Sequence, residues 1–302
     1  MPDPWLDRSV GALLGLAVGD ALGAPFEGLD RDTYPRVADY ASGGMHNVEP
    51  GAWTDDTAMA ICLAESLLAR DGVDEQDLLE RFLRWYRAGE NSATGTAIGI
   101  SEKTSATLEA FERSHRIDVA VAVENPGNGA IMRLAPVAIL FRGSSTEARC
   151  AAVRQARVTH TASAALEAAG SLAELLVVAL RTGDLDAVLQ TAASGGHPDL
   201  RSISEFRAKT RAQISSVPRA VDTLEAALWC LHHARDFEGT VVEAVNLGGD
   251  SDTIGAVAGQ LAGAIFGASV IPARWMASLI SRERLVELAR QLYQQGSDKF
   301  VS

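Results

Sequence analysis

The stretch Asn246-Leu247-Gly248-Gly249-Asp250-Ser251-Asp252-Thr253 joins two apolar runs that we predict to be buried helices. The second run, residues 254–266, is rich in small residues. Asp250 and Asp252 therefore lie in a turn between buried segments, where a carboxylate needs a charged partner or a metal ion. Helix capping by Ser251 or Asp252 is the alternative interpretation, and it accounts for one of the two acids but poorly for both.

A second acidic cluster, Trp53-Thr54-Asp55-Asp56-Thr57, opens the apolar run 58–68. Together the two clusters supply an all-oxygen ligand set: Thr54, Asp55, Asp56, Asp250, Asp252 and Thr253. Such ligands suit Mg²⁺, Mn²⁺ or Ca²⁺, and the clusters lack the cysteine or histidine that is usual in a zinc site. Acids at helix N-termini are also held ionised by the helix dipole. Because four carboxylates exceed the need of one divalent ion, we predict two ions about 3.5–4 Å apart.

Five motifs resemble, in order, those of the ADP-ribosylglycohydrolase family, which includes the dinitrogenase reductase-activating glycohydrolases. They are Gly19-Asp20-Ala21-Leu22-Gly23 with Glu27, Thr54-Asp55-Asp56-Thr57, Asn128-Gly129-Ala130-Ile131-Met132-Arg133, Thr159-His160 and Gly248-Gly249-Asp250-Ser251-Asp252-Thr253. Each motif is weak alone, but the ordered set spans residues 9–268. The resemblance implies an all-α fold, a dinuclear Mg²⁺ or Mn²⁺ centre, and hydrolysis of the bond that joins ADP-ribose to an acceptor.

The resemblance also implies which residues contact the substrate. Glu27 matches a glutamate that faces the bound ribose, and it joins Asp55 and Asp56 as a candidate catalytic acid or base. His160 matches a histidine on the adenosine side. The other candidate substrate contacts are Asp20, Gly127, Asn128, Gly129, Ala130 and Arg133. Asp20 has a structural alternative, in which its carboxylate accepts backbone N–H groups of a neighbouring loop.

The turn Pro126-Gly127-Asn128-Gly129 leads into an apolar run that ends at Phe141. We predict a helix over this run, whose N-terminus would present free backbone N–H groups to a diphosphate. Such turns are common without any phosphate, so most of the support for this interpretation comes from the family resemblance. Arg133 could pair either with phosphate or with a carboxylate in the core.

The segment Ala97-Ile98-Gly99 departs from the family pattern, because many relatives have aspartate at its first position. In the family that aspartate reaches the ribose and is a candidate acid or base, whereas alanine can neither accept a hydrogen bond nor move a proton. Three interpretations follow: a natural variant that uses another acid, an inactive relative, or a residue substituted to trap a ligand. We expect slow turnover with ADP-ribose binding retained.

The composition is that of a globular protein with a sizeable core, with 47% hydrophobic and 22% charged residues among 302. A net charge of −12 disfavours general attraction to nucleic-acid phosphate, although an ADP-ribosylated nucleobase stays open as a substrate. We expect a cytoplasmic protein without a membrane span, since no leader is seen and no apolar segment reaches about 18 residues uninterrupted. The three separate cysteines are expected to be free buried thiols: Cys62, Cys150 and Cys230.

We predict one all-α domain over residues 1–302, a compact orthogonal multi-helix bundle with the metal cleft at helix N-termini. The first helix, 6–23, has a glycine every fourth residue, which forms a smooth stripe for close packing: Gly11, Gly15, Gly19 and Gly23. Residues 28–53 lack periodicity and are expected to form a long loop along one wall of the cleft. Residues 194–218 are expected to be a loop followed by a polar helix. Few segments alternate with period 2, so no sheet is expected.

Other function classes stay open at this stage. An inactive structural or binding member of the family would have no need to keep both acidic clusters. A different dinuclear-metal hydrolase, such as a phosphoesterase, is disfavoured only through the resemblance. The acceptor is also open between arginine, serine, a nucleobase and smaller ADP-ribosyl compounds. Pro218-Arg219 stands where many relatives have Gly-Tyr, and an arginine near the acceptor would disfavour a cationic leaving group.

Overall fold

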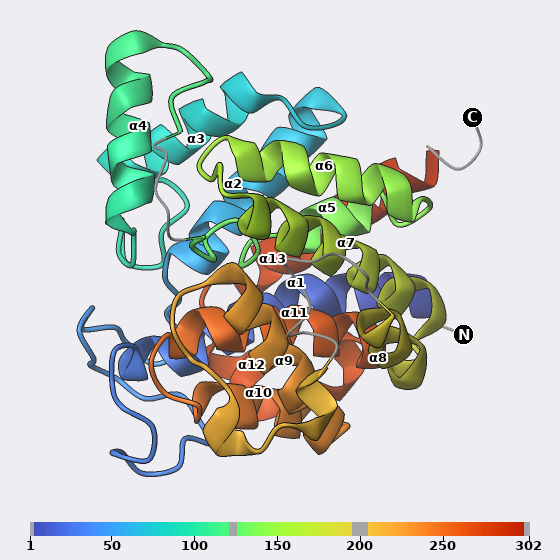
Figure 1. The fold of residues 1–302 in the computed structure, drawn as a ribbon. Coiled ribbons are helices and arrows are strands. Elements are labelled where there is room, and N and C mark those ends of the chain that lie inside the picture. The colour runs from blue at the N-terminus through green and yellow to red at the C-terminus, as the bar shows by residue number, and fades with distance from the viewer. Residues whose placement is uncertain (1–2, 121–125, 195–204, 299–302) are drawn as a thin grey trace.

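The computed structural model describes residues 3–120, 126–194 and 205–298, and this part of the chain is helical with no strand (Figure 1). The helices are α1 (Pro4–Gly23), α2 (Asp55–Arg70), α3 (Glu75–Ala88), α4 (Glu102–Ser114), α5 (Ala135–Leu140), α6 (Ser145–Arg157), α7 (Ser163–Thr182), α8 (Leu185–Ala193), α9 (Ala220–Ala234), α10 (Phe237–Val245), α11 (Ser251–Phe266), α12 (Ala273–Ser278) and α13 (Arg282–Asp298). The loop between α1 and α2 contains one isolated β-bridge, between Gly43 and Val48. The predicted all-α fold is confirmed.

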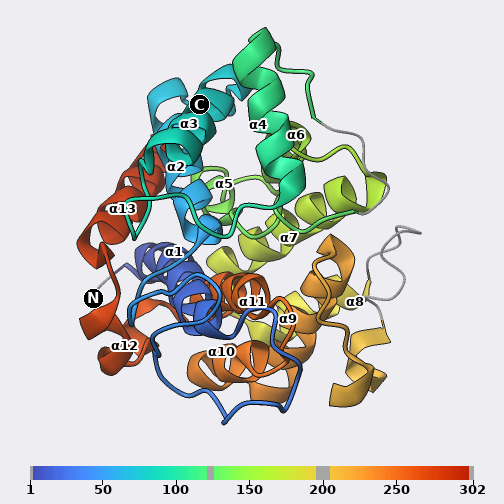
Figure 2. The same ribbon diagram turned by 90° about the vertical axis from the view of Figure 1, so that its left-hand side faces the viewer.

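Helices α1 and α11 pack against each other through the middle of the molecule (Figures 1 and 2). Their glycines face each other: a Cβ atom built on Gly15 would lie 2.1 Å from the Gly259 carbonyl oxygen, and the reverse distance is 2.0 Å. Gly19 and Gly255 meet in the same way, one turn later in α1 and one turn earlier in α11. The glycine stripe therefore fixes an antiparallel register, in which the end of α1 meets the acidic start of α11.

Replacing Gly259 by alanine is expected to lower the free energy of unfolding by about 3 kcal/mol, because the added methyl group meets backbone that cannot move aside. Gly170→Ala in α7 is the matched control, since a Cβ atom there meets only the flexible Arg149 side chain at 3.0–3.1 Å. Alanine also has the higher helix propensity, by about 1 kcal/mol. Denaturant unfolding compares the two variants, and equal stabilities would disprove the close contact at Gly259.

Two local predictions are wrong. The helix expected from Ala130 begins only at Ala135, and residues 128–134 form successive turns in which the Ile131 N–H donates to the Asn128 carbonyl at 2.9 Å. Pro136 stands in the first turn of α5, a position that proline favours at a helix start. The polar helix expected before Pro218 is also absent from residues 205–218, which contain short 3₁₀ turns instead.

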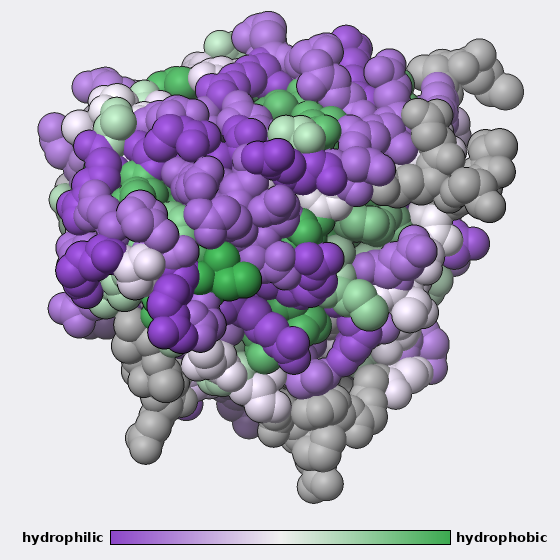
Figure 3. All heavy atoms as spheres, turned by 90° about the horizontal axis from the view of Figure 1, so that it is seen from above, coloured by the Kyte–Doolittle hydropathy of each residue, from purple (hydrophilic) through white to green (hydrophobic). Residues whose placement is uncertain are grey.

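The apolar helices and thiols lie mostly inside the protein. Two helical segments, Pro4–Phe26 and Ser163–Thr182, are long and apolar enough to cross a membrane, but 94% and 61% of their apolar windows are buried in this fold. The face in Figure 3 is largely hydrophilic, with apolar side chains in small patches between hydrophilic ones. Cys62 and Cys230 are buried as expected, whereas Cys150 is exposed because it lies on the outer face of α6.

Candidate metal centre and substrate cleft

A cavity of about 960 Å³ lies where the first turns of α2, α4 and α11 meet. It is lined by Glu27, by Met45 and His46 of the long loop, by residues 97–104, and by the Gly127-Asn128-Gly129 turn. Asp55, Asp250, Asp252 and Thr253 complete the acidic part of the lining. The cavity thus lies at helix N-termini, and the loop 28–53 forms part of its wall, as the sequence predicted.

The two acidic clusters meet at one end of this cavity. Oxygen atoms of Glu27, Asp250 and Asp252 lie within 4.8 Å of one another. Oxygen atoms of Asp20, Asp56 and Asp252 form a second group and also lie within 4.8 Å of one another. Asp252 belongs to both groups, which is the placement that suits a carboxylate lying between two metal ions.

Helix capping explains only part of the second cluster. Asp252 Oδ1 accepts the Thr253 N–H at 2.9 Å, and the Ser251 hydroxyl donates to the carbonyl of the last residue of α1. Asp250 precedes α11 but makes no side-chain capping bond, and instead accepts a hydrogen bond from the Asn128 side chain. One oxygen of Asp252 therefore satisfies a free N–H of the first turn of α11. Capping does not explain Asp250.

The first cluster contains a carboxylate oxygen with no donor. Asp56 Oδ1 is buried and has no hydrogen-bond partner in the described part of the chain. The Thr54 hydroxyl lies 3.3 Å from Asp56 Oδ2 and 3.3 Å from Asp252 Oδ2, so it joins the two clusters. A buried anionic oxygen without a partner is costly, and a cation would satisfy it. The residues present therefore fit bound divalent ions.

Crowding and burial shift the ionisation of these acids. Burial first, and then the neighbouring carboxylates, raise the pKa values of Asp55, Asp56 and Asp252 well above their usual range. Burial also raises the pKa of Asp250 to about 6, despite the hydrogen bond from Asn128. Positive charge in the cluster is what would keep all four aspartates ionised at neutral pH, and hard divalent cations prefer such oxygen ligands.

Asp20 is a structural residue, which corrects its prediction as a substrate contact. Its Oδ1 accepts the N–H and the hydroxyl of Thr54, both at 2.9 Å, and its Oδ2 accepts the N–H and the hydroxyl of Thr57 at 3.0 and 2.7 Å. It is fully buried outside the cavity lining. Four donors occupy its two oxygens, so Asp20 fixes the start of α2 from α1, as in its structural alternative.

Arg133 and Ala130 are also buried beneath the cavity and do not line it, which corrects both predictions. The Arg133 guanidinium donates to Gln155 Oε1 at 2.8 Å and to the Thr159 hydroxyl at 2.9 Å, and it stacks 4.7 Å from the centre of the Phe82 ring. Gln155 Nε2 in turn donates to the Ala130 carbonyl at 2.9 Å. Arg133 therefore supports the turn through neutral partners: it lies outside the cavity lining, and its hydrogen bonds within the described residues include no carboxylate.

His160 lies against the glycine turn and lines the cavity. Its Nδ1 is 2.8 Å from the Thr159 hydroxyl, which accepts from Arg133, and we assign the tautomer in which this hydroxyl donates its proton to Nδ1. The ring then carries its proton on Nε2. A Cβ atom on Gly129 would lie 3.1 Å from the ring, so glycine allows this packing. Burial lowers the pKa of His160 well below its usual range and keeps the ring neutral.

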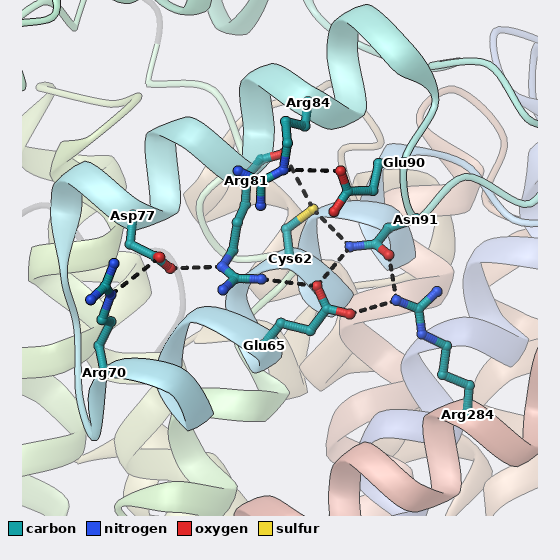
Figure 4. A network of polar contacts seen from close by, with 9 residues as sticks. All are labelled: Cys62, Glu65, Arg70, Asp77, Arg81, Arg84, Glu90, Asn91 and Arg284. Atoms are coloured by element: carbon teal, nitrogen blue, oxygen red, sulfur yellow. Dashed lines mark hydrogen bonds and ion pairs between the residues drawn. The ribbon is translucent and has the colours of Figure 1, made fainter.

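The segment that carries Ala97 is held by a polar network on the outer side of α2 (Figure 4). Glu65 accepts from Arg81 at 3.2 Å, from Asn91 at 3.1 Å and from Arg284. Asn91 has a left-handed φ of 65° just after α3, so this network fixes the beginning of the loop. Further along, a Cβ atom on Gly99 would lie 2.3 Å from Asp55 Oδ1, and only glycine permits that approach.

The cavity residues that the sequence reasoning missed include His46 and Lys103. His46 Nε2 lies 2.6 Å from Glu27 Oε2, and this hydrogen bond raises the pKa of the histidine. Nothing in the aperiodic loop 28–53 indicated the pair. Lys103, in the first turn of α4, also lines the cavity. The sequence feature that could have pointed to Lys103 is the rarity of lysine, since the whole chain has only three.

Arg219 does not support the argument against a cationic leaving group. Pro218 lines the cavity, but Arg219 is exposed and lies outside the lining, at the start of α9. Its charge is therefore not presented to a bound acceptor.

Comparison with known proteins agrees with the arrangement of the site. Residues 1–300 match the ADP-ribosylglycohydrolase family model. "ADP-ribosylarginine hydrolase Tri1" of Pseudomonas putida (strain GB-1) is 38% identical, across 98% of this chain and 80% of the relative. "ADP-ribosyl-[dinitrogen reductase] glycohydrolase" of Rhodospirillum rubrum is 29% identical across 90% of each chain. A solved structure described as an "ADP-ribosylglycohydrolase-related protein complex" is 42% identical, with a TM-score of 0.85 over 97% of this chain and 99% of that one. The chain therefore belongs to the ADP-ribosylglycohydrolase family and is a hydrolase of ADP-ribosyl linkages.

Proposed function

We propose that the chain hydrolyses the glycosidic bond between ADP-ribose and arginine side chains of modified proteins, with two divalent ions, Mg²⁺ or Mn²⁺. The observation that carries the proposal is the shared position of Asp252, which groups with Glu27 and Asp250 in the cavity lining and with Asp56 and the structural Asp20 outside it. The predicted ligand set is retained for the ions: Thr54, Asp55, Asp56, Asp250, Asp252 and Thr253. Two relatives named as ADP-ribosylarginine hydrolases, 38% and 35% identical, support the arginine acceptor.

The charge of the cavity also favours arginine. Glu27 gathers at the acidic end with Asp20, Asp55, Asp56, Asp250 and Asp252, and six carboxylates exceed the four positive charges of two divalent ions. A guanidinium acceptor is therefore attracted to this end when the ions are bound. Glu102 adds an exposed carboxylate to the lining.

The chain's own residues can perform the remaining tasks. Bound ions would hold the ribose hydroxyls and make a water molecule more acidic. The acidic end stabilises positive charge that develops on the anomeric carbon in an oxocarbenium-like transition state. Glu27, which lines the cavity and is hydrogen-bonded to His46 at 2.6 Å, is the carboxylate that we assign to accept or return a proton, with Asp55 and Asp56 as the other candidates. His160 offers its Nε2–H to the other part of the ligand.

A substrate panel tests the proposal. ADP-ribosyl-arginine, ADP-ribosyl-serine and an ADP-ribosylated nucleobase are incubated with Mg²⁺ or Mn²⁺, and free ADP-ribose is measured. We expect release from the arginine conjugate, abolished by chelation and not restored well by Zn²⁺. Release of ADP-ribose from another conjugate alone would show that the acceptor is not arginine. Release of inorganic phosphate from a panel of phosphoesters would indicate a phosphoesterase.

Ala97 favours a second candidate function, that of a weakened or inactive member of the family that binds ADP-ribose. Ala97 lines the cavity and offers no acid there. Tight binding of ADP-ribose without release from any conjugate would support this candidate over the enzyme.

A further inference from the structure

Lys103 is a cation in the cavity with no partner of its own. Its side chain lines the cavity, and its ammonium group is shielded from solvent without a hydrogen-bond partner among residues 3–120, 126–194 and 205–298. By contrast, Lys209 forms an ion pair with Glu225 at 2.6 Å. A shielded ammonium is costly unless an anion or another acceptor satisfies it. Lys103 is therefore poorly explained as a structural residue.

Lys103 lines the same cavity as His160 and the Gly127–Gly129 turn, and it does so from the first turn of α4. Its charge contributes to lowering the pKa of His160, and burial lowers the pKa of Lys103 itself. An unpartnered ammonium in this lining is available to an anionic group of a bound ligand.

The cavity contains other donors besides Lys103. His160 directs its Nε2–H there and packs against the glycine turn, with a Cβ atom on Gly127 predicted 3.4 Å from Nε2. The backbone N–H groups of Gly127 and Gly129 donate to no acceptor in the described part of the chain. The cavity lining therefore contains a cluster of carboxylates and, besides them, an unpartnered cation and neutral donors.

We propose that Lys103 binds the diphosphate of the ADP-ribosyl ligand from α4, as the cationic partner of the Gly127–Gly129 turn. The inference rests on the proposed function and adds a residue to it. A diphosphate supplies the anionic oxygens that the ammonium lacks, and lysine binds phosphate as a compact point charge. With the diphosphate bound there, the distal ribose extends toward the carboxylates, where the bond is cleaved.

Calorimetric titration with ADP-ribose and with ADP tests this inference on the intact chain. Lys103→Met keeps the apolar stem and removes the charge, and is expected to raise the Kd of both ligands about 10- to 100-fold, the usual effect of a hydrogen bond to a charged group. Lys103→Arg is expected to restore most of the affinity. Arg113→Met removes a charge from the last turn of the same helix, outside the cavity, and is expected to leave both Kd values unchanged.

The outcomes separate the inference from the proposed function. Unchanged affinity of Lys103→Met for both ligands would overturn the role of Lys103 while the enzyme assignment stands. Weaker binding of ADP-ribose with unchanged binding of ADP would also overturn it, because the lysine would then contact the distal ribose. Failure of the unmodified chain to bind ADP-ribose at all would instead overturn the proposed function. Lys103→Arg keeps the test valid if Lys103→Met does not fold.

Discussion

Replacing Asp252 by asparagine is expected to remove at least one divalent ion per chain and to lower ADP-ribosyl hydrolysis by more than about 100-fold. Asp252 is the one acid shared by both groups of carboxylate oxygens, so its charge serves both predicted ions. Even residues that only support metal ligands cost about 10- to 100-fold when mutated. Asparagine keeps the volume and can still accept the Thr253 N–H, so the fold should survive the change.

Metal analysis and thermal unfolding together check this prediction. The unmodified chain should gain thermal stability with Mn²⁺, because ions that bind only the folded state stabilise it by mass action and relieve the repulsion between carboxylates. Asp252→Asn should lose most of that gain. Asp184→Asn is the matched control, since Asp184 caps α8 at an exposed site outside the cavity. Two ions per chain retained in Asp252→Asn would show that the ligand assignment is wrong.

The features predicted from the sequence were those encoded in local patterns. A glycine at every fourth residue of α1 indicates that another helix packs closely against it. The small residues of α11 identify that helix, so the two patterns together predict the central α1–α11 pair. An acid pair before an apolar run indicates a helix start with a charge to satisfy. The starts of α2 and α11 both lie at the end of α1. The acidic residues at that end of the cavity could therefore be predicted from the sequence.

The features that escaped prediction depend on how distant segments meet. Arg133 was expected at phosphate or at a carboxylate, but its partners Gln155 and Thr159 come from α6 and the turn after it. The pairing of Glu27 with His46 depends on the path of an aperiodic loop. Pro136, by contrast, was a readable signal that the helix starts late, and the apolar run around it concealed that signal.

Restoring an acid at position 97 is expected to raise the single-turnover rate of hydrolysis by about 10²- to 10⁴-fold, the usual range for general acid–base catalysis. Ala97 lines the cavity, two residues before the glycine whose backbone lies against Asp55. A carboxylate introduced by Ala97→Asp would thus enter the cavity near the acidic cluster. ADP-ribose affinity should change little, because the proposed diphosphate contacts are Lys103 and the Gly127–Gly129 turn and do not include position 97.

Ala97→Asn is the control that separates proton transfer from hydrogen bonding, because it adds nearly the same volume and a hydrogen-bonding group without a titratable proton. Only Ala97→Asp should be faster if the missing group is an acid or base. Equal acceleration in both variants would mean that the new side chain positions the ribose instead. An unchanged rate in Ala97→Asp, or a comparable rate already in the unmodified chain, would mean that the missing carboxylate is not catalytic here. The proton would then have to be carried by Glu27, whose carboxylate lines the same cavity and is held by His46.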